Sequence, residues 1–266
     1  MLYPTSLTNN AWNFIEPLFE YFGYRDKGRK HSIRSIVDAI FYIVDNGNKW
    51  RSLPNDFPPW KTVYHHFAKW SKERLWESIN LNLVELARKA EGRNPTPSLA
   101  SIDSQSQDAE PGIEGRGLDG NKKRNGRKRH IAVDILGLIA VDILGLILGC
   151  MCTPANESDR HAGEILTEQL NDSENFPRIA KILGDNIYDW VGQSCPIPIT
   201  VESKEREEGQ KGFVPEAFRW VVERTFAWLN RQRRLSRNFE KKTCHQESMN
   251  FIASIRLCLK KIQKSI

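Results

Sequence analysis

Residues 126–153 read GRKRHIAVDILGLIAVDILGLILGCMCT, a basic start followed by apolar runs around Leu-Gly turns. The runs 130–138 and 146–153 are rich in branched apolar residues and are bounded by glycines, a pattern typical of buried strands. This stretch predicts two strands and therefore a domain that is not purely helical.

The phrase IAVDILGL occurs twice without a gap, at residues 131–138 and 139–146. Repeat architectures need about 20–50 residues per unit and at least about three copies, so the phrase does not indicate one. Its even length preserves the inward and outward alternation of a strand. We interpret it as a tandem duplication, absorbed by longer hairpin arms or by bulging one copy out; two additional central strands would contradict this. A new metal pair of Asp134 and Asp142 is the weaker alternative, because nothing else nearby supplies ligands.

Further strands and helices are predicted on both sides of this stretch. The predicted strands are 99–106, 178–185 and 197–203, and the predicted helices are 158–170, 215–236 and 247–264. Ser158 is a candidate N-cap, and Pro215 suits the first turn of its helix. Strands mixed with amphipathic helices predict an α/β domain with its helices outside.

The first 93 residues follow a different pattern, with apolar residues at helical spacing. They predict four helices, at residues 7–22, 32–47, 61–73 and 75–90. Such a group suits a helix-turn-helix-like DNA-binding module and a plain helical bundle equally well. The Pro-rich joint 92–98 then divides the chain into a helical domain, 1–93, and an α/β domain, 98–266.

The charge of the chain is concentrated in two places. The 266 residues carry a net charge of +6, with seven Lys/Arg against one Asp in 115–130 and eight Lys/Arg against two Glu in 219–242. Clustered cations favour polyphosphate, although charge runs are most often solvated faces. The longest apolar run, 135–152, is interrupted by Asp142 and glycines, so we expect no membrane span, and the absence of a secretory leader favours the cytoplasm. Cys150 and Cys152 are expected to be core residues rather than zinc ligands.

Three acids, Asp103, Asp185 and Glu223, lie where such a domain could gather them. Carboxylates from separate elements can bridge two metal ions about 4 Å apart, which clamp the attacking and leaving oxygens of a phosphodiester. Mg²⁺ suits this arrangement because it takes oxygen ligands and keeps several waters. Arg219 stands one turn before Glu223, where it could neutralise the carboxylate or grip phosphate.

Five phrases resemble, in the same order, the DDE transposases of bacterial insertion sequences, specifically the insertion-sequence four/five superfamily. They are WRSLPNDFPPWKTVYHHFAKW (50–70), SIDSQS (101–106), GRKRHIAVDILGL (126–138), TPANESDR (153–160) and RWVVERTFAWLNRQRRL (219–235). The resemblance implies an RNase H-like mixed sheet flanked by helices, preceded by the helical, helix-turn-helix-like segment. Asp103, Asp185 and Glu223 are similar to the catalytic and metal-binding acids of the family, and Arg219 to the Arg of its helical signature.

The implied function is that of a transposase. Such an enzyme binds the terminal inverted repeats of its own element, cuts there with Mg²⁺ (Mn²⁺ can substitute) and joins the 3′-hydroxyl to target DNA. The implied partners are DNA and a second copy of the chain in a homodimer, and the implied location is the cytoplasm, at the nucleoid. A decayed copy that only binds DNA is the alternative, and a nuclease that does not join ends is a weaker one.

Several positions depart from the family pattern. The phrase GDNIYD (184–189) has Asn186 and Ile187 where the family has glycines, and Asp189 competes with Asp185 for the role of second acid. The stretch between Asp185 and Glu223 looks short for the family. Glu216 and Asn230 replace a Tyr and a Lys, and Arg231 could supply the missing cation.

The remaining DNA-contact predictions rest on charge and on the resemblance. The basic run predicts phosphate contacts, and Trp50 with Arg51 is expected either to face DNA or to pack against the neighbouring FPPW phrase. The residues of the basic run are Lys122, Lys123, Arg124, Arg127, Lys128 and Arg129.

Overall fold

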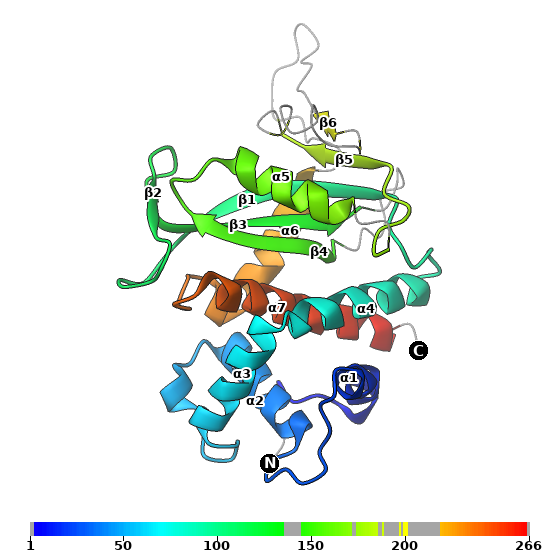
Figure 1. Cartoon of the computed structure of the whole chain (residues 1–266), viewed down its shortest axis with the longest axis vertical. Helices are drawn as coiled ribbons and strands as arrows, with labels where there is room; N and C mark the ends of the chain where they lie inside the picture. Colours follow the sequence, from blue (N-terminus) through cyan, green and yellow to red (C-terminus); the bar gives the residue numbers. More distant parts are fainter. Residues whose placement is uncertain are drawn as a thin grey trace, which may run out of the picture.

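The computed structural model describes residues 3–135, 145–171, 174–185, 188, 197, 199–201 and 219–264. Figure 1 shows a sheet with α5 on one face and α6 behind the other, above a group of helices from both ends of the chain. The predicted fold class, a mixed sheet of the RNase H-like kind flanked by helices and preceded by a helical segment, is confirmed.

The sheet has the strand order β2-β3-β1-β5-β6, and β4 pairs with residues 127–133 of β3, beyond the part that β2 pairs with. β3 is antiparallel to β1, β2 and β4, whereas β1, β5 and β6 run parallel to one another. The strands are β1 (Leu99–Asp108), β2 (Gly117–Asp119), β3 (Arg124–Asp134), β4 (Ile147–Pro154), β5 (Lys181–Gly184) and β6 (Ile199–Val201).

Within the described residues the seven α-helices agree with the sequence pattern in order, with differences at their ends, and two short 3-10 helices are added. Ser32 caps the second helix by accepting the backbone N–H of Ser35, and Gly47 ends it with a φ of 72°, which favours glycine. The helices are α1 (Asn9–Tyr21), α2 (Ile33–Asn46), η1 (Trp50–Ser52), α3 (Trp60–Lys72), α4 (Leu75–Ala90), α5 (Asp159–Leu170), α6 (Arg219–Asn230), η4 (Arg233–Leu235) and α7 (Thr243–Lys264).

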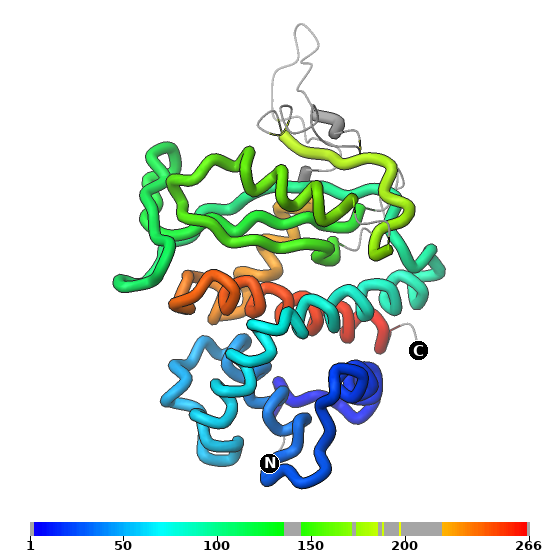
Figure 2. The backbone as a smooth tube through the Cα atoms, in the orientation of Figure 1, coloured from blue at the N-terminus to red at the C-terminus, as the bar shows by residue number. Residues whose placement is uncertain are grey.

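The helical segment and the sheet share one continuous hydrophobic core. Figure 2 shows α4 lying along α7, so that the last helix of the predicted first domain packs against the last helix of the chain. Asn80 of α4 donates to the carbonyl of Ile147 in β4 at 2.7 Å, and Arg88 forms a buried ion pair with Asp134 of β3. The boundary predicted near residue 93 therefore lies in a connection between elements that pack on each other.

The duplicated phrase does not place a strand inside the hairpin. β3 and β4 pair directly, and Asp134 donates its backbone N–H to the carbonyl of Leu146, which brings the first copy next to the end of the second. Both sides of β3 are already occupied, by β1 and by β2 with β4. Among the described residues no additional strand lies between β3 and its partners, and residues 136–144 of the phrase lie outside them. Asp134 is bonded to Arg88, which assigns it to packing rather than to a metal.

Candidate active site and DNA-contact residues

Asp103 and Asp185 stand at neighbouring positions of the sheet. The parallel pairing of β1 with β5 sets Leu99, Ala100 and Ser101 opposite Lys181, Ile182 and Leu183. The paired residues end at Ser101 and Leu183, and continuing the same register by two residues would set Asp103 level with Asp185, which follows β5. Adjacent strands lie about 4.8 Å apart and paired residues point to the same face. The fold therefore brings two of the three predicted acids together from positions far apart in the chain.

Asp103 is half-buried in the middle of β1, opposite Ile131 of β3. Its Oδ1 accepts the backbone N–H of Ser104 at 2.7 Å, which orients the carboxyl group. Carboxyl groups of this kind are the oxygen ligands that Mg²⁺ prefers.

Helix α6, which carries Glu223, covers the same face of the sheet as Asp103. Gln105, two residues along β1 and on the same face, accepts the side-chain amide of Asn230 at 3.4 Å. Asn230 stands seven residues after Glu223 and therefore on the same helical stripe. The opposite stripe of α6 faces the start of β4, where Thr225 donates to the carbonyl of Gly145 at 2.9 Å. Glu223 therefore lies on the exposed side of α6, on the same stripe as Asn230.

Glu223 itself is solvent-exposed, and the structure does not place the three acids together as a finished ligand set. Within the described residues, no three His, Cys, Asp or Glu side chains lie close enough to hold a metal ion. The pair of Asp103 and Asp185 nevertheless fits Mg²⁺, which is commonly held by one or two carboxylates together with waters and substrate phosphate.

Tyr188 joins the two acid-bearing segments, a connection that the sequence pattern did not indicate. Its side chain is 2% exposed, its ring packs on Gly184, and its backbone N–H donates to the carbonyl of Asp185 at 3.0 Å. Its phenol is hydrogen bonded to the hydroxyl of Ser104, next to Asp103. Burial, followed by the charges of Asp103, Asp159 and Asp185, raises the pKa of Tyr188 well above its usual value, so the phenol stays neutral.

The predicted basic run divides into an exposed and a buried half. Lys122, Lys123 and Arg124 are exposed at the β2–β3 turn, where phosphate contact is sterically open. Arg127, Lys128 and Arg129 are buried, because β3 starts at Arg124 rather than near residue 130 and carries them into the sheet. The phosphate-contact prediction is therefore corrected to the exposed half.

The buried residues of the run form hydrogen bonds and ion pairs within the protein. Arg127 donates to the backbone carbonyls of Glu114, Glu240 and Lys241. Lys128 forms an ion pair of 3.0 Å with Asp159 of α5 on the opposite face.

Arg129 is held by neutral partners on the face that α6 covers. It donates to Gln105, to the side-chain oxygen of Asn230 at 2.8 Å and to the carbonyl of Phe226 at 3.3 Å. Burial lowers the pKa of Arg129 to about 10, so the guanidinium remains charged at neutral pH. Asn230, the departure from the family's Lys, completes a hydrogen-bonded link between α6 and the sheet.

The other predicted DNA-contact residues lie in three different settings. Trp50 is partly buried against Tyr64 and Phe67. Arg51 is exposed and lies over the Trp60 ring at 5.5 Å, which agrees with the alternative of packing against FPPW. Arg231 is exposed just after α6. Arg219 begins α6, and its side chain lies outside what the structure describes.

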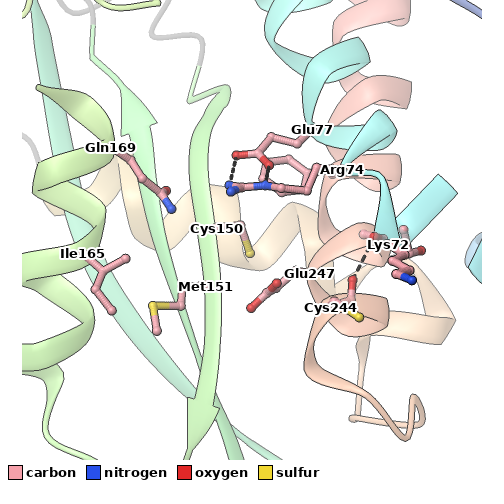
Figure 3. A pocket seen from close by; sticks show the side chains of 12 residues that line it. Lys72, Arg74, Glu77, Cys150, Met151, Ile165, Gln169, Cys244 and Glu247 are labelled. Atoms are coloured by element: carbon pink, nitrogen blue, oxygen red, sulfur yellow. Dashed lines mark hydrogen bonds and ion pairs between the residues drawn. The ribbon is translucent and has the colours of Figure 1, made fainter. Parts of the chain in front are cut away.

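A separate hollow of about 460 Å³ lies among α4, α5, α7 and β4. Figure 3 shows Glu247 between Cys150 and Cys244, opposite the ion pair of Arg74 with Glu77. The Glu247 carboxylate accepts the backbone N–H of Cys152 at 2.8 Å, and burial raises its pKa. β4 is separated from β1 by β3, so this hollow is distinct from the pair of Asp103 and Asp185. As predicted, Cys150 and Cys152 are buried, and both are free thiols.

Comparisons with known protein families give three matches in chain order. A family model described as a transposase of the IS4/5 family matches residues 7–80, and two models described as transposase DDE domains match residues 94–200 and 184–260. Neither curated proteins nor solved structures give a match. Among the described helices, none has both the length and the apolar character needed to cross a bilayer.

Proposed function

The chain belongs to the transposases of the IS4/5 family with a DDE domain, and we propose that it binds the terminal inverted repeats of its own element, cuts there and joins the freed ends to target DNA. Transposase DDE domains generally use divalent metal ions, and we propose Mg²⁺, for which Mn²⁺ can substitute. The observation that supports the proposal is the parallel pairing of β1, which holds Asp103, with β5, which ends directly before Asp185.

In this proposal Asp103 and Asp185 hold the ion from the sheet, and Glu223 completes the site from α6 by turning its exposed side chain toward β1. The bound ion would activate the attacking oxygen and stabilise the leaving oxygen of the phosphodiester. Ser104 orients Asp103 through its backbone N–H, and Tyr188 fixes the segment that carries Asp185. The reaction requires no covalent bond between protein and DNA. Because two DNA ends must be brought together, a homodimer at the nucleoid is part of the proposal.

The experiment uses the full-length protein, a labelled duplex of the repeat that flanks its gene, Mg²⁺ and a supercoiled target plasmid. The proposal predicts a nick that leaves a 3′-hydroxyl, followed by a joined product. Cleavage without joining would instead identify a nuclease. Specific binding without cleavage would identify a decayed copy that acts only as a DNA-binding protein.

A further inference from the structure

The turn between β2 and β3 is held in one shape by Asp119. This residue is 6% exposed, and its Oδ1 accepts the backbone N–H groups of Asn121 and Lys122, both at 3.0 Å. Its Oδ2 accepts the hydroxyl of Ser106 at 2.5 Å, which ties the turn to β1. The Ser106 hydroxyl holds the pKa of Asp119 below its usual value, so the carboxylate is ionised at neutral pH. An Asp that bonds the N–H groups two and three residues ahead is a standard device for fixing a turn.

The fixed turn presents cations to solvent. Lys122, Lys123 and Arg124 are all exposed, and Lys123 has a φ of 51°, in the region that side chains other than glycine seldom adopt. Arg124 forms a surface ion pair with Asp108, whereas Lys122 and Lys123 have no ion pair within the described residues. An unfavourable backbone conformation persists only when its surroundings enforce it. Here the Asp119 bonds to the two residues before Lys123 and the pairing of Asp119 with Arg124 close the turn around it.

β3 sets the distance between this turn and the acid pair. Asp103 lies opposite Ile131, and Arg124 is seven residues away along the same strand. At about 3.3 Å per residue this distance is roughly 23 Å. A DNA strand advances about 3.4 Å per base pair, so the same span corresponds to about seven base pairs. Figure 1 shows β2 and its turn at the outer edge of the sheet, where a duplex lying along β3 would meet it.

We propose that the β2–β3 turn is a second DNA contact that is shaped by Asp119 and grips backbone phosphates about seven base pairs from the bond cut at the acid pair. The inference rests on the proposed function and adds the location of a phosphate contact and the residue that preorganises it. Asp119 acts here as a positioning residue, since it touches the turn rather than the DNA.

The test measures binding of the full-length protein to the same repeat duplex over a series of salt concentrations. The doubly substituted Lys122→Ala/Lys123→Ala protein is expected to bind at least about tenfold more weakly, with a salt slope reduced by about two, because each phosphate contact contributes about 0.9. The matched control is Lys260→Ala/Lys264→Ala, which removes two exposed lysines at the end of α7, outside both cationic clusters, and is expected to change affinity less than about threefold.

Asp119→Ala distinguishes the effect of the shape of the turn on DNA binding from the effect of the Asp119 charge. Removing a negative charge strengthens DNA binding if electrostatics alone acts, whereas losing the shape of the turn weakens it, and we expect a loss of about fivefold. Ser106→Ala leaves the net charge unchanged and is expected to weaken binding in the same direction. Unchanged or tighter binding by Asp119→Ala, with the thermal unfolding temperature of the unmutated protein, would overturn the inference.

A positional probe completes the test. An uncharged methylphosphonate about seven base pairs from the cut is expected to weaken binding of the unmutated protein and to leave the doubly substituted protein unaffected. Equal sensitivity of the two proteins would overturn the inference, while failure of the unmutated protein to bind the repeat would contradict the proposed function itself.

Discussion

Arg88 of α4 and Asp134 of β3 form an ion pair in which the side chains are 5% and 0% exposed. Arg88 also donates to the carbonyl of Asn94 at 2.7 Å, so one guanidinium connects the helical segment, the joint after it and the sheet. The pair explains why Asp134 belongs to the fold rather than to a metal site. It also makes the helical segment and the sheet depend on each other for stability.

Replacing one member of this pair should destabilise the protein strongly. Removing one partner of a buried ion pair typically costs about 3–5 kcal/mol, because the other charge is left buried and unpaired. We expect a loss of this size for Arg88→Met in urea unfolding, and a much smaller loss for the double variant Arg88→Met/Asp134→Leu. A double variant as unstable as the single one would show that the pair itself contributes net stability.

Deleting one copy of the duplicated phrase should leave the fold intact. Removing residues 131–138 or 139–146 gives the same sequence, and the pairing of β3 with β4 and the Arg88 contact of Asp134 can both form from a single copy. A shorter connection lowers the entropy cost of closing the hairpin by about 0.6 kcal/mol per halving of length. We expect an unchanged or slightly higher free energy of unfolding. A loss of several kcal/mol would mean that the second copy makes contacts of its own.

Acid should destabilise the protein through His130. This side chain is 0% exposed, and its Nε2 lies 2.9 Å from the Thr153 hydroxyl. Burial lowers the pKa of His130 to about 4. Asp159 raises this pKa, whereas Lys128 and Lys122 lower it further. The unfolded chain, with a histidine pKa of 6.5, then binds more protons than the folded one, so stability falls as the pH drops from about 6.5 to about 4. Between pH 7 and pH 5 this amounts to about 2 kcal/mol.

The contribution of His130 can be isolated by comparing the unmutated protein with His130→Gln in urea unfolding at both pH values. The variant should lose about 2 kcal/mol less between pH 7 and pH 5, although it can be less stable throughout. The comparison is needed because burial also lowers the pKa of His66 to about 4. Equal losses in the two proteins would contradict the role of His130.

Tyr188→Phe should distinguish the contribution of the Tyr188 hydroxyl group from that of its aromatic ring. The variant keeps the packing on Gly184 and loses only the hydrogen bond with Ser104, at a cost of about 1 kcal/mol. Tyr188→Ala should cost about 3–5 kcal/mol through the cavity it leaves. If the phenol positions Ser104 and Asp103, Tyr188→Phe should also raise the Mn²⁺ concentration needed for half-saturation, followed by electron paramagnetic resonance. A variant with unchanged Mn²⁺ affinity would show that Tyr188 only supports the fold.

The sequence predicted the elements well and the placement of side chains less well. Helical spacing defined α2 and α4, the caps Ser32 and Gly47 defined the ends of α2, and the apolar phrases defined β3 and β4, because these signals are local. The burial of Arg127 and Arg129 was missed for a physical reason. Their partners are the carbonyls of Glu240 and Lys241, before α7, and the side chain of Asn230 in α6, and these are distant in sequence. Short β2 has too few residues to show alternation.

In the candidate site, too, the sequence indicated the residues but not the contacts between segments that are distant in the chain. The neighbouring positions of Asp103 and Asp185 follow from strand order, which a family resemblance implies but spacing alone does not. Tyr188 carried no signal in the sequence, because its role depends on packing against Gly184 and on a hydroxyl of another strand. Glu223 lies exposed on α6, and its place beside the two aspartates stays a prediction.

Asp103, Asp185 and Glu223 are proposed to form the catalytic site. The most direct test measures metal-dependent nicking of the repeat duplex by the variants Asp103→Asn, Asp185→Asn and Glu223→Gln. DNA binding is measured on the same samples. The matched control is Glu168→Gln, an exposed carboxylate on α5 at the other face of the sheet. We predict that each of the three variants loses at least about 100-fold in nicking rate and still binds the repeat, while the control nicks normally. Nicking at the unmutated rate by any of the three would contradict the assignment of that acid, and by all three would contradict the site.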